Sequence, residues 1–224
     1  MIDVEKVTDQ KSAPGLIENP CRDALIDLAS QVPAGECVVE IGSYMGRSTG
    51  HLALGVERGG RGVKVHAIDP WEQRTDYDPD YLATARSVAD YSKSETRQAF
   101  EAHLASSGAA EYVEVHQGLA VDVASEWEGP KVGLLFHDGD HATKAVFEDL
   151  KAWLPHMASG SVVVLHDTDD VRYGVSEGAR KAFTRTKQLR EQWDWAGREV
   201  HPWAKNQGRA PDERRRGFTV VRCR

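Results

Sequence analysis

The chain has few cysteines and lacks any long apolar run. Only Cys21, Cys37 and Cys223 occur in 224 residues, so we expect no disulfide framework. No apolar stretch approaches the roughly 20 residues that a membrane-spanning helix requires. The first residues also lack the basic start and apolar stretch of a signal peptide. We therefore expect a cytoplasmic protein without a membrane partner.

Basic residues are also fewer than acidic ones. Lysine and arginine number 28 against 35 aspartates and glutamates, which gives a net charge of −7. A general nucleic-acid-binding protein needs a basic face to meet phosphates, so we expect no nucleic acid partner. A length of 224 residues suits one α/β domain with a large core and is short for two.

Strand-like apolar runs alternate with helical patterns along most of the chain. The predicted strands cover 38–41, 63–68, 112–117, 132–136, 162–165, 193–200 and 218–223. The segments between several of them carry apolar residues at helical spacing, the clearest being the stripe from Val146 to Met157. This pattern predicts an α/β fold: a doubly wound, Rossmann-like, mostly parallel seven-stranded sheet with helices on both faces and an antiparallel C-terminal strand.

We divide the chain into an N-terminal arm, residues 1–21, and one domain, residues 22–224. The arm is polar and contains prolines and a glycine, so we expect it to be loosely held. Segments 71–94 and 201–216 are candidates to cover a substrate, because connections of such length are usually functional. The second is basic. An anionic substrate would explain its charge, and so would a solvated charge run.

The stretch from Val38 to Thr49 has the pattern of a strand, a glycine turn and the start of a helix. Gly42 and Gly46 would let the backbone pass close to a ligand at the carboxyl end of the strand. Glu40 would repel a pyrophosphate and suits a cationic ligand, such as the sulfonium of S-adenosylmethionine (SAM). Tyr44 stands where the dinucleotide fingerprint needs a glycine, which disfavours a nicotinamide cofactor.

Asp69 ends the second predicted strand and is followed by a proline. An acidic residue there can accept hydrogen bonds from both ribose hydroxyls of an adenosine. An aspartate before proline is also common as a turn residue or helix cap. The acidic glycine turn in the preceding unit favours the ribose role.

Acidic residues follow two later strands: Asp138 and Asp140 after one, and Asp167, Asp169 and Asp170 after the other. If these strands are neighbours, Asp138 and Asp167 converge and would share a cation or a proton. Oxygen-rich ligation suggests Mg²⁺. Alternatively, Asp140 is the N-cap of the following helix, and Asp169 and Asp170 form a polar turn.

Two histidines accompany these carboxylates. His166 could add a nitrogen ligand, which would shift the preference toward softer divalent ions. His141 lies three residues after Asp138, and its near-neutral pKa suits proton abstraction. A histidine at a strand end is more often a hydrogen-bonded scaffold residue.

Taken together, these motifs resemble the class I SAM-dependent methyltransferases. They resemble in particular the small-molecule O-methyltransferase branch that includes caffeoyl-CoA and catechol O-methyltransferases, macrolide-sugar O-methyltransferases and cephalosporin-hydroxylase-like proteins. The resemblance covers residues 22–184 and rests on four segments: Val39–Thr49, Phe136–His141, Asp149–Pro155 and Gly160–Asp167.

The resemblance implies roles for particular residues. SAM contacts are implied at Glu40, Gly42, Ser43, Ser48, Asp69 and Gly118, with Asp138 near the methionine end. Metal ligands are implied at Asp138, His166 and Asp167, where the family usually has Asp or Glu in place of His166. His141 stands at the position of a lysine base in the catechol and caffeoyl-CoA enzymes, so we assign catalysis to His141 and Asp138.

The function we expect is methyl transfer from SAM to a hydroxyl of a small molecule, a sugar or secondary metabolite, with metal assistance. Two alternatives remain: a SAM-binding protein without transfer activity, and a nicotinamide-dependent oxidoreductase. The family resemblance also implies a homo-oligomer.

Overall fold

A computed structural model describes residues 1–9, 17, 19–71, 93–168, 174–185 and 218–223. Several sequence predictions lie outside these residues. They are the strand around 193–200, nearly all of the candidate covering segment 71–94, the whole of segment 201–216, and the polar turn at Asp169 and Asp170.

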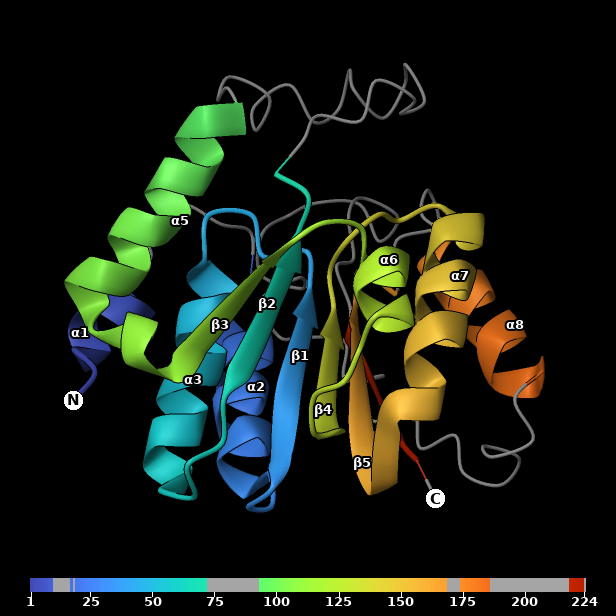
Figure 1. The fold of residues 1–224 in the computed structure, drawn as a ribbon, viewed down its shortest axis with the longest axis horizontal. Coiled ribbons are helices and arrows are strands. Elements are labelled where there is room, and N and C mark those ends of the chain that lie inside the picture. The colour runs from blue at the N-terminus through green and yellow to red at the C-terminus, as the bar shows by residue number, and fades with distance from the viewer. Residues whose placement is uncertain (10–16, 18, 72–92, 169–173, 186–217, 224) are drawn as a thin grey trace, which may run out of the picture.

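One sheet with the order β3-β2-β1-β4-β5-β6 forms the centre of the protein (Figure 1). Its strands are β1 (Glu36–Ile41), β2 (Val65–Asp69), β3 (Val113–Gln117), β4 (Lys131–His137), β5 (Met157–His166) and β6 (Phe218–Arg222). Strands β1 to β5 pair in parallel, and β6 pairs antiparallel with β5. This confirms the predicted Rossmann-like sheet, except that the described residues form six strands where seven were predicted.

Helices cover both faces of the sheet, as predicted (Figure 1). On one face lie α1 (Val4–Thr8), α2 (Asn19–Gln31), α3 (Arg47–Gly59) and α5 (Lys93–Ser107); on the other lie α6 (Ala120–Ser125), α7 (Thr143–Trp153) and α8 (Val175–Arg185). Alternate residues of β1 point to the two faces. Val38 packs in a cluster with Leu52 of α3, whereas Val39 packs in a cluster with Leu150 of α7.

Backbone chemistry explains where two of these helices end. Helix α3 ends at Gly59, and Gly60 adopts the left-handed conformation (φ 63°) that glycine tolerates best. Helix α7 ends at Trp153, before a short 3₁₀ turn over Leu154–His156. The prediction that the helical stripe reaches Met157 is wrong, because Pro155 cannot continue the helix. Met157 instead begins β5.

Residues 1–9 are held against the domain, so the expectation of a loosely held arm is wrong for them. Ile2 and Val7 are buried in one cluster with residues of α3 and α5. The backbone N–H of Ile2 donates to Glu57 Oε1 at 2.7 Å, and that of Asp3 donates to the carbonyl of Ser107 at 2.9 Å. These bonds join the start of the chain to α3 and α5.

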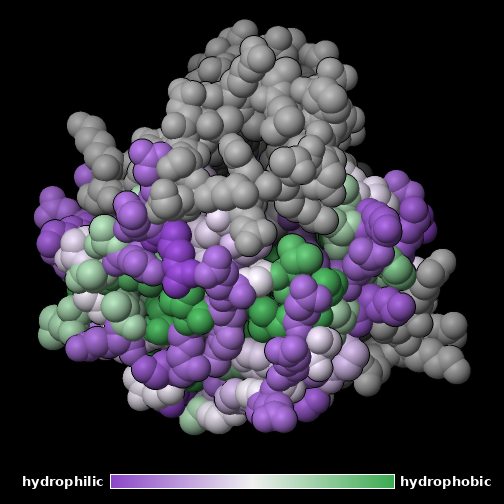
Figure 2. Space-filling view, turned by 45° about the horizontal axis from the view of Figure 1, so that its top comes forward, coloured by the Kyte–Doolittle hydropathy of each residue, from purple (hydrophilic) through white to green (hydrophobic). Residues whose placement is uncertain are grey.

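Hydrophilic side chains cover much of the described surface in Figure 2. In the described ranges, the exposed large hydrophobic side chains are Met1, Val4, Val115 and Leu119. Within those same ranges, no helix has both the length and the apolar character needed to cross a bilayer.

Candidate active site at the carboxyl rim of the sheet

The carboxyl ends of four neighbouring strands meet at one edge of the sheet, which we call the carboxyl rim (top of Figure 1). Ile41 at the end of β1 pairs with His137 at the end of β4, which pairs with Leu165 of β5. On the other side, Ile41 pairs with Ile68 of β2. The rim therefore gathers the predicted residues that follow these strands, because parallel strands end on the same side.

The turn between β1 and α3 depends on its two glycines. Gly42 (φ 87°) lies against the loop after β4, and a Cβ there would overlap the carbonyl of Asp138. Gly46 (φ 86°) precedes α3, and a Cβ there would come within 2.9 Å of the Phe100 ring. Both glycines were predicted to make room for a ligand. In the described structure, the atoms that a side chain at these positions would overlap belong to the protein itself.

Glu40 is fully buried beneath this turn. The hydroxyl of Ser43 donates to its Oε2 at 2.8 Å, and the hydroxyl of Thr49 donates to the same oxygen. Its other oxygen, Oε1, has no hydrogen bond in the described structure. Burial raises the pKa of Glu40 to about 7, although the hydroxyls of Ser48, Thr49 and Ser43 oppose the shift. Thr49 was not among the predicted site residues.

Asp69 connects the turn after β2 to the turn after β1. Its Oδ2 accepts from the backbone N–H of Tyr44 at 2.9 Å, and its Oδ1 accepts from that of Trp71 at 2.6 Å. The turn role that the sequence offered as an alternative is therefore present. Burial raises the pKa of Asp69, while these backbone N–H groups act in the opposite direction. Gly118, also predicted for this site, donates its N–H to the carbonyl of Asp69 at 3.2 Å.

Two carboxylates and two imidazoles meet at the ends of β4 and β5; we call Asp138, His141, His166 and Asp167 the rim cluster. His166 Nδ1 lies 3.1 Å from Asp138 Oδ1 and 3.5 Å from Asp167 Oδ1. His141 Nε2 lies 3.1 Å from Asp167 Oδ2 and 3.8 Å from Asp138 Oδ1. The predicted convergence of Asp138 and Asp167 is confirmed, since β4 and β5 are neighbours.

Opposite charges inside the rim cluster outweigh its burial. Burial alone would raise the pKa of Asp138, but His166 and His141 lower it to about 2, and they also lower the pKa of Asp167. Burial would lower the pKa of both histidines, but the two carboxylates raise that of His141 to about 9 and that of His166 to about 10. These raised pKa values favour the cationic form of both rings; the role of His141 as a base stays a prediction.

The rim cluster has the chemistry of a cation site. Ligand atoms of Asp138, His141 and Asp167 all lie within 4.8 Å of one another. His166 Nδ1 and Asp167 Oδ1 are buried without a hydrogen bond in the described structure, although they face each other. Asp167 also adopts a positive φ of 56°, a conformation found often at functional sites. The predicted ligands Asp138, His166 and Asp167 are adjacent, and His141 joins them as a fourth donor.

Asp140 has a local structural role. Its Oδ1 accepts from the backbone N–H of Ala142 at 2.8 Å, while Ala142 itself is the N-cap residue of α7. The prediction of Asp140 as the N-cap is therefore wrong by two residues. The carboxylate still stabilises the start of the helix, as that alternative proposed.

A family comparison agrees with this geometry. Residues 39–168, more than half of the chain, match the sequence profile of a family described as a methyltransferase domain. The chain belongs to this methyltransferase family. A comparison with curated proteins finds no significant match.

Solved structures share the fold of this methyltransferase. The O-methyltransferase TomG from Streptomyces achromogenes, involved in tomaymycin synthesis and solved with SAM, is 19% identical, with 93% of this chain and 81% of TomG covered and a TM-score of 0.61. An O-methyltransferase from Bacillus cereus in complex with SAH is 16% identical, with 94% and 84% covered and a TM-score of 0.59. At these identities the likeness shows the fold alone.

Trp71, the first residue of the candidate covering segment 71–94, lies against the β1–α3 turn of this methyltransferase. Its ring nitrogen donates to the carbonyl of Tyr44 at 2.8 Å, and its ring packs on Phe100 at a centroid distance of 4.9 Å. Both Trp71 (φ 44°) and Tyr44 (φ 46°) have positive φ values. Apart from the proline before Trp71, no sequence pattern indicates this arrangement.

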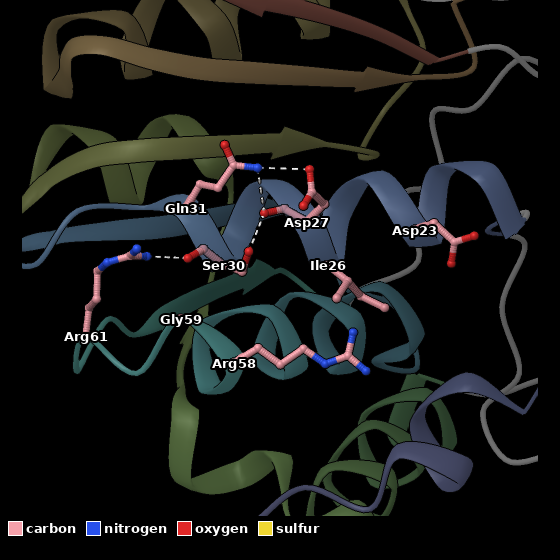
Figure 3. Close-up of a pocket in the computed structure, with 8 residues that line it drawn as sticks. All are labelled: Asp23, Ile26, Asp27, Ser30, Gln31, Arg58, Gly59 and Arg61. Carbon is pink, nitrogen blue, oxygen red and sulfur yellow. Dashed lines mark hydrogen bonds between the residues drawn. The ribbon is translucent and has the colours of Figure 1, made fainter.

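A shallow pocket elsewhere on the methyltransferase does not coincide with the site. It lies between α2 and the end of α3 and is lined by Asp23, Ile26, Asp27, Ser30, Gln31, Arg58, Gly59 and Arg61 (Figure 3). The end of α3 leads into the start of β2, at the opposite edge of the sheet from the rim. None of the predicted site residues lines this pocket.

Proposed function

We propose that the methyltransferase transfers a methyl group from SAM to a hydroxyl of a small molecule, a sugar or secondary metabolite, with the help of a divalent ion. The rim cluster beside the β1–α3 turn carries this proposal. Methyl transfer from a sulfonium is an in-line displacement, and a hydroxyl is a poor nucleophile while it keeps its proton. An amine would need neither metal nor base, so the rim cluster favours oxygen as the acceptor.

We assign the adenosine end of SAM to Asp69 and the methionine end to the β1–α3 turn and Asp138. Asp69 interacts with the backbone N–H groups of Tyr44, Trp71 and Ser43, and since a carboxylate has about four acceptor positions, there is still room for a ribose hydroxyl. The unsatisfied, buried oxygen of Glu40 suits a cationic ligand above it. Gly42, Ser43, Gly46 and Ser48 shape the turn, and Gly118 borders Asp69. The SAM complex of TomG and the SAH complex of the Bacillus cereus enzyme support this choice of cofactor.

We assign the divalent ion to Asp138, His166 and Asp167, so that His141 is not among its ligands. The two carboxylates favour Mg²⁺, and each imidazole ligand moves the preference toward softer ions. When bound, such an ion would lower the pKa of a coordinated hydroxyl and so make its oxygen a better nucleophile for the methyl group. The two carboxylates would also orient that hydroxyl by holding the ion beside the cofactor turn.

His141 is our candidate for the proton acceptor. Asp138 and Asp167 hold its proton in the ion-free state. Once the charges of these carboxylates are neutralised, the pKa of His141 returns toward its ordinary value, and the ring can accept the proton of the hydroxyl. The same contacts orient the ring at the rim.

Incubating the protein with SAM and a collection of hydroxylated metabolites tests the proposal, with methylated products detected by mass spectrometry. We expect one acceptor class to gain a methyl group, excess EDTA to stop the reaction, and Mg²⁺ to restore it. Full activity in EDTA would contradict the proposed role of the ion but not methyl transfer itself. Calorimetry adds a second arm: binding of NADH without binding of SAM contradicts the cofactor assignment, and SAM binding without any product would favour a SAM-binding protein.

The cytoplasmic location, the homo-oligomer and the lack of nucleic acid or membrane partners stay predictions.

A further inference from the structure

A second group of possible metal ligands lies at the edge of the sheet, away from the rim cluster. His66 of β2 pairs in register with Glu114 of β3, and His116 lies two residues further along β3. Because alternate residues of a strand share a face, all three side chains project from the same side of the sheet. Their ligand atoms all lie within 4.8 Å of one another.

The distances in this group lie close to those between donors around a small divalent ion. His66 Nδ1 lies 3.0 Å from His116 Nε2 and 3.5 Å from Glu114 Oε2. Donor atoms bound to Zn²⁺ at about 2.0–2.2 Å with tetrahedral angles are about 3.3–3.6 Å apart. An ion could therefore enter between the three donors with small side-chain movements.

Trp127 forms an apolar wall beside the two imidazoles. Its ring meets His66 edge-on at a centroid distance of 4.8 Å and lies 5.9 Å from His116. Its own ring nitrogen donates to the carbonyl of Pro130 at 3.1 Å, which fixes the wall in place. Such a shell limits water and orients ligands.

We propose that His66, Glu114 and His116 bind a zinc-class divalent ion that joins edge strand β3 to β2. Two imidazoles and one carboxylate favour Zn²⁺ over Mg²⁺, in contrast to the rim cluster with its two aspartates. Strand β3 is the part of the sheet that gains most from such a clamp, since it lies at the edge of the sheet and most of its residues are exposed or half-buried. Glu114, whose side chain is 55% exposed, leaves room for water to complete the coordination.

The competing explanation is a hydrogen bond between neutral His66 and His116, which also accounts for the 3.0 Å separation. A hydrogen bond needs no third ligand, so it assigns no role to Glu114. Replacement of Glu114 therefore separates the two explanations. Since this side chain is half exposed, the variant should fold.

Zinc binding in an Asp138→Asn background, which removes one carboxylate of the rim cluster, tests the proposal. Zn²⁺ is added to chelator-treated protein in excess Mg²⁺, and stoichiometry is measured by native mass spectrometry and affinity by competition with a chromophoric chelator. We expect one bound Zn²⁺ and a raised melting temperature. Adding Glu114→Gln or His116→Gln should weaken Zn²⁺ binding by at least about tenfold and remove the thermal shift.

His156→Gln is the matched control, because His156 packs against Trp153 and is outside the group. It should bind Zn²⁺ as tightly as the parent protein. Far-UV circular dichroism and the melting temperature without zinc show that each variant is folded. Equal zinc affinity in the parent, the Glu114→Gln and the His116→Gln proteins would overturn the proposal, as would a parent that binds no zinc. Neither result bears on methyl transfer at the rim.

Discussion

The two halves of the carboxyl rim neutralise their carboxylates in opposite ways. At the ends of β1 and β2, Glu40 and Asp69 accept hydrogen bonds from hydroxyls and backbone N–H groups, and burial raises the pKa of each. At the ends of β4 and β5, Asp138 and Asp167 face two imidazoles, which lower the pKa of each.

This difference separates carboxylates held by fixed donors from carboxylates held by groups that can lose a proton. The donors of the first half are parts of the chain that cannot leave, so its carboxylates fix the turns. The partners of the second half are protons on His141 and His166, which a divalent ion can replace. The first half is therefore suited to position a cofactor, and the second to change its charge during a reaction.

The largest expected effect separates the halves directly. Asp138→Asn should lower methyl transfer by at least about 100-fold, because it removes a charge from the proposed reacting centre, while SAM affinity should fall by a much smaller factor, because Asp138 is only one of the groups assigned to the methionine end. Turnover of the acceptor found in the screen and calorimetry with SAM measure the two quantities. Asp140→Asn is the control, since its carboxylate contacts the backbone of Ala142, and it should stay near full activity. A similar loss of methyl transfer in Asp138→Asn and Asp140→Asn would contradict the special role of the rim cluster.

In the other half, Asp69→Ala should weaken SAM binding by about 10- to 100-fold, because contacts to the ribose and to the N–H groups of Tyr44 and Trp71 are lost together. Asp69→Asn keeps an acceptor for one of these groups, so its SAM affinity should lie between those of Asp69→Ala and the wild type. Calorimetry with SAM measures both. Unchanged SAM affinity in Asp69→Ala would show that this carboxylate serves only the turns.

The raised pKa of Glu40 predicts a pH effect on folding. Its folded pKa of about 7 lies above the value of 4.5 expected without burial, so the folded state binds the proton more tightly. The wild type then loses stability as pH rises from the lower value through the higher one. The glutamine side chain cannot ionise, so the free energy of unfolding of Glu40→Gln relative to that of the wild type should rise by about 1–3 kcal/mol over that range.

Urea unfolding of both proteins at about pH 5 and about pH 8 measures this difference. A constant difference between the two proteins would mean that Glu40 is charged throughout. Glu40 would then be ionised like Asp138 and Asp167, and the two halves of the rim would not differ in this respect.

The smallest expected effect concerns one hydrogen bond of the scaffold. Thr49→Val keeps the shape of the side chain but removes a donor to buried Glu40, which should lower the free energy of unfolding by about 1–3 kcal/mol. Ser125→Ala is the control, because the hydroxyl of Ser125 makes an exposed local bond to Asp122 and its loss should cost little. Equal effects in the two variants would contradict the role of Thr49.

Much of the rim could be predicted because it depends on local patterns. Apolar runs place the strands, and the acidic residues Glu40, Asp69, Asp138 and Asp167 must then lie at strand ends. That Asp138 and Asp167 meet was conditional on β4 and β5 being neighbours, which the sheet confirms. The packing of Ile2 and Val7 against the domain was missed, because a short polar segment with only two residues to bury shows no periodicity.

By itself, the sequence determined the order of strands and helices, the acidic glycine turn and the position of each charged residue relative to a strand end. Only the tertiary structure decided what each charge faces. It gave Glu40 and Asp69 protein donors, surrounded Asp138 and Asp167 with imidazoles, and brought His66 beside Glu114 and His116. The physical reason is that ionisation and ligation depend on burial and on atoms within a few ångströms, and the chain brings those atoms together from distant positions.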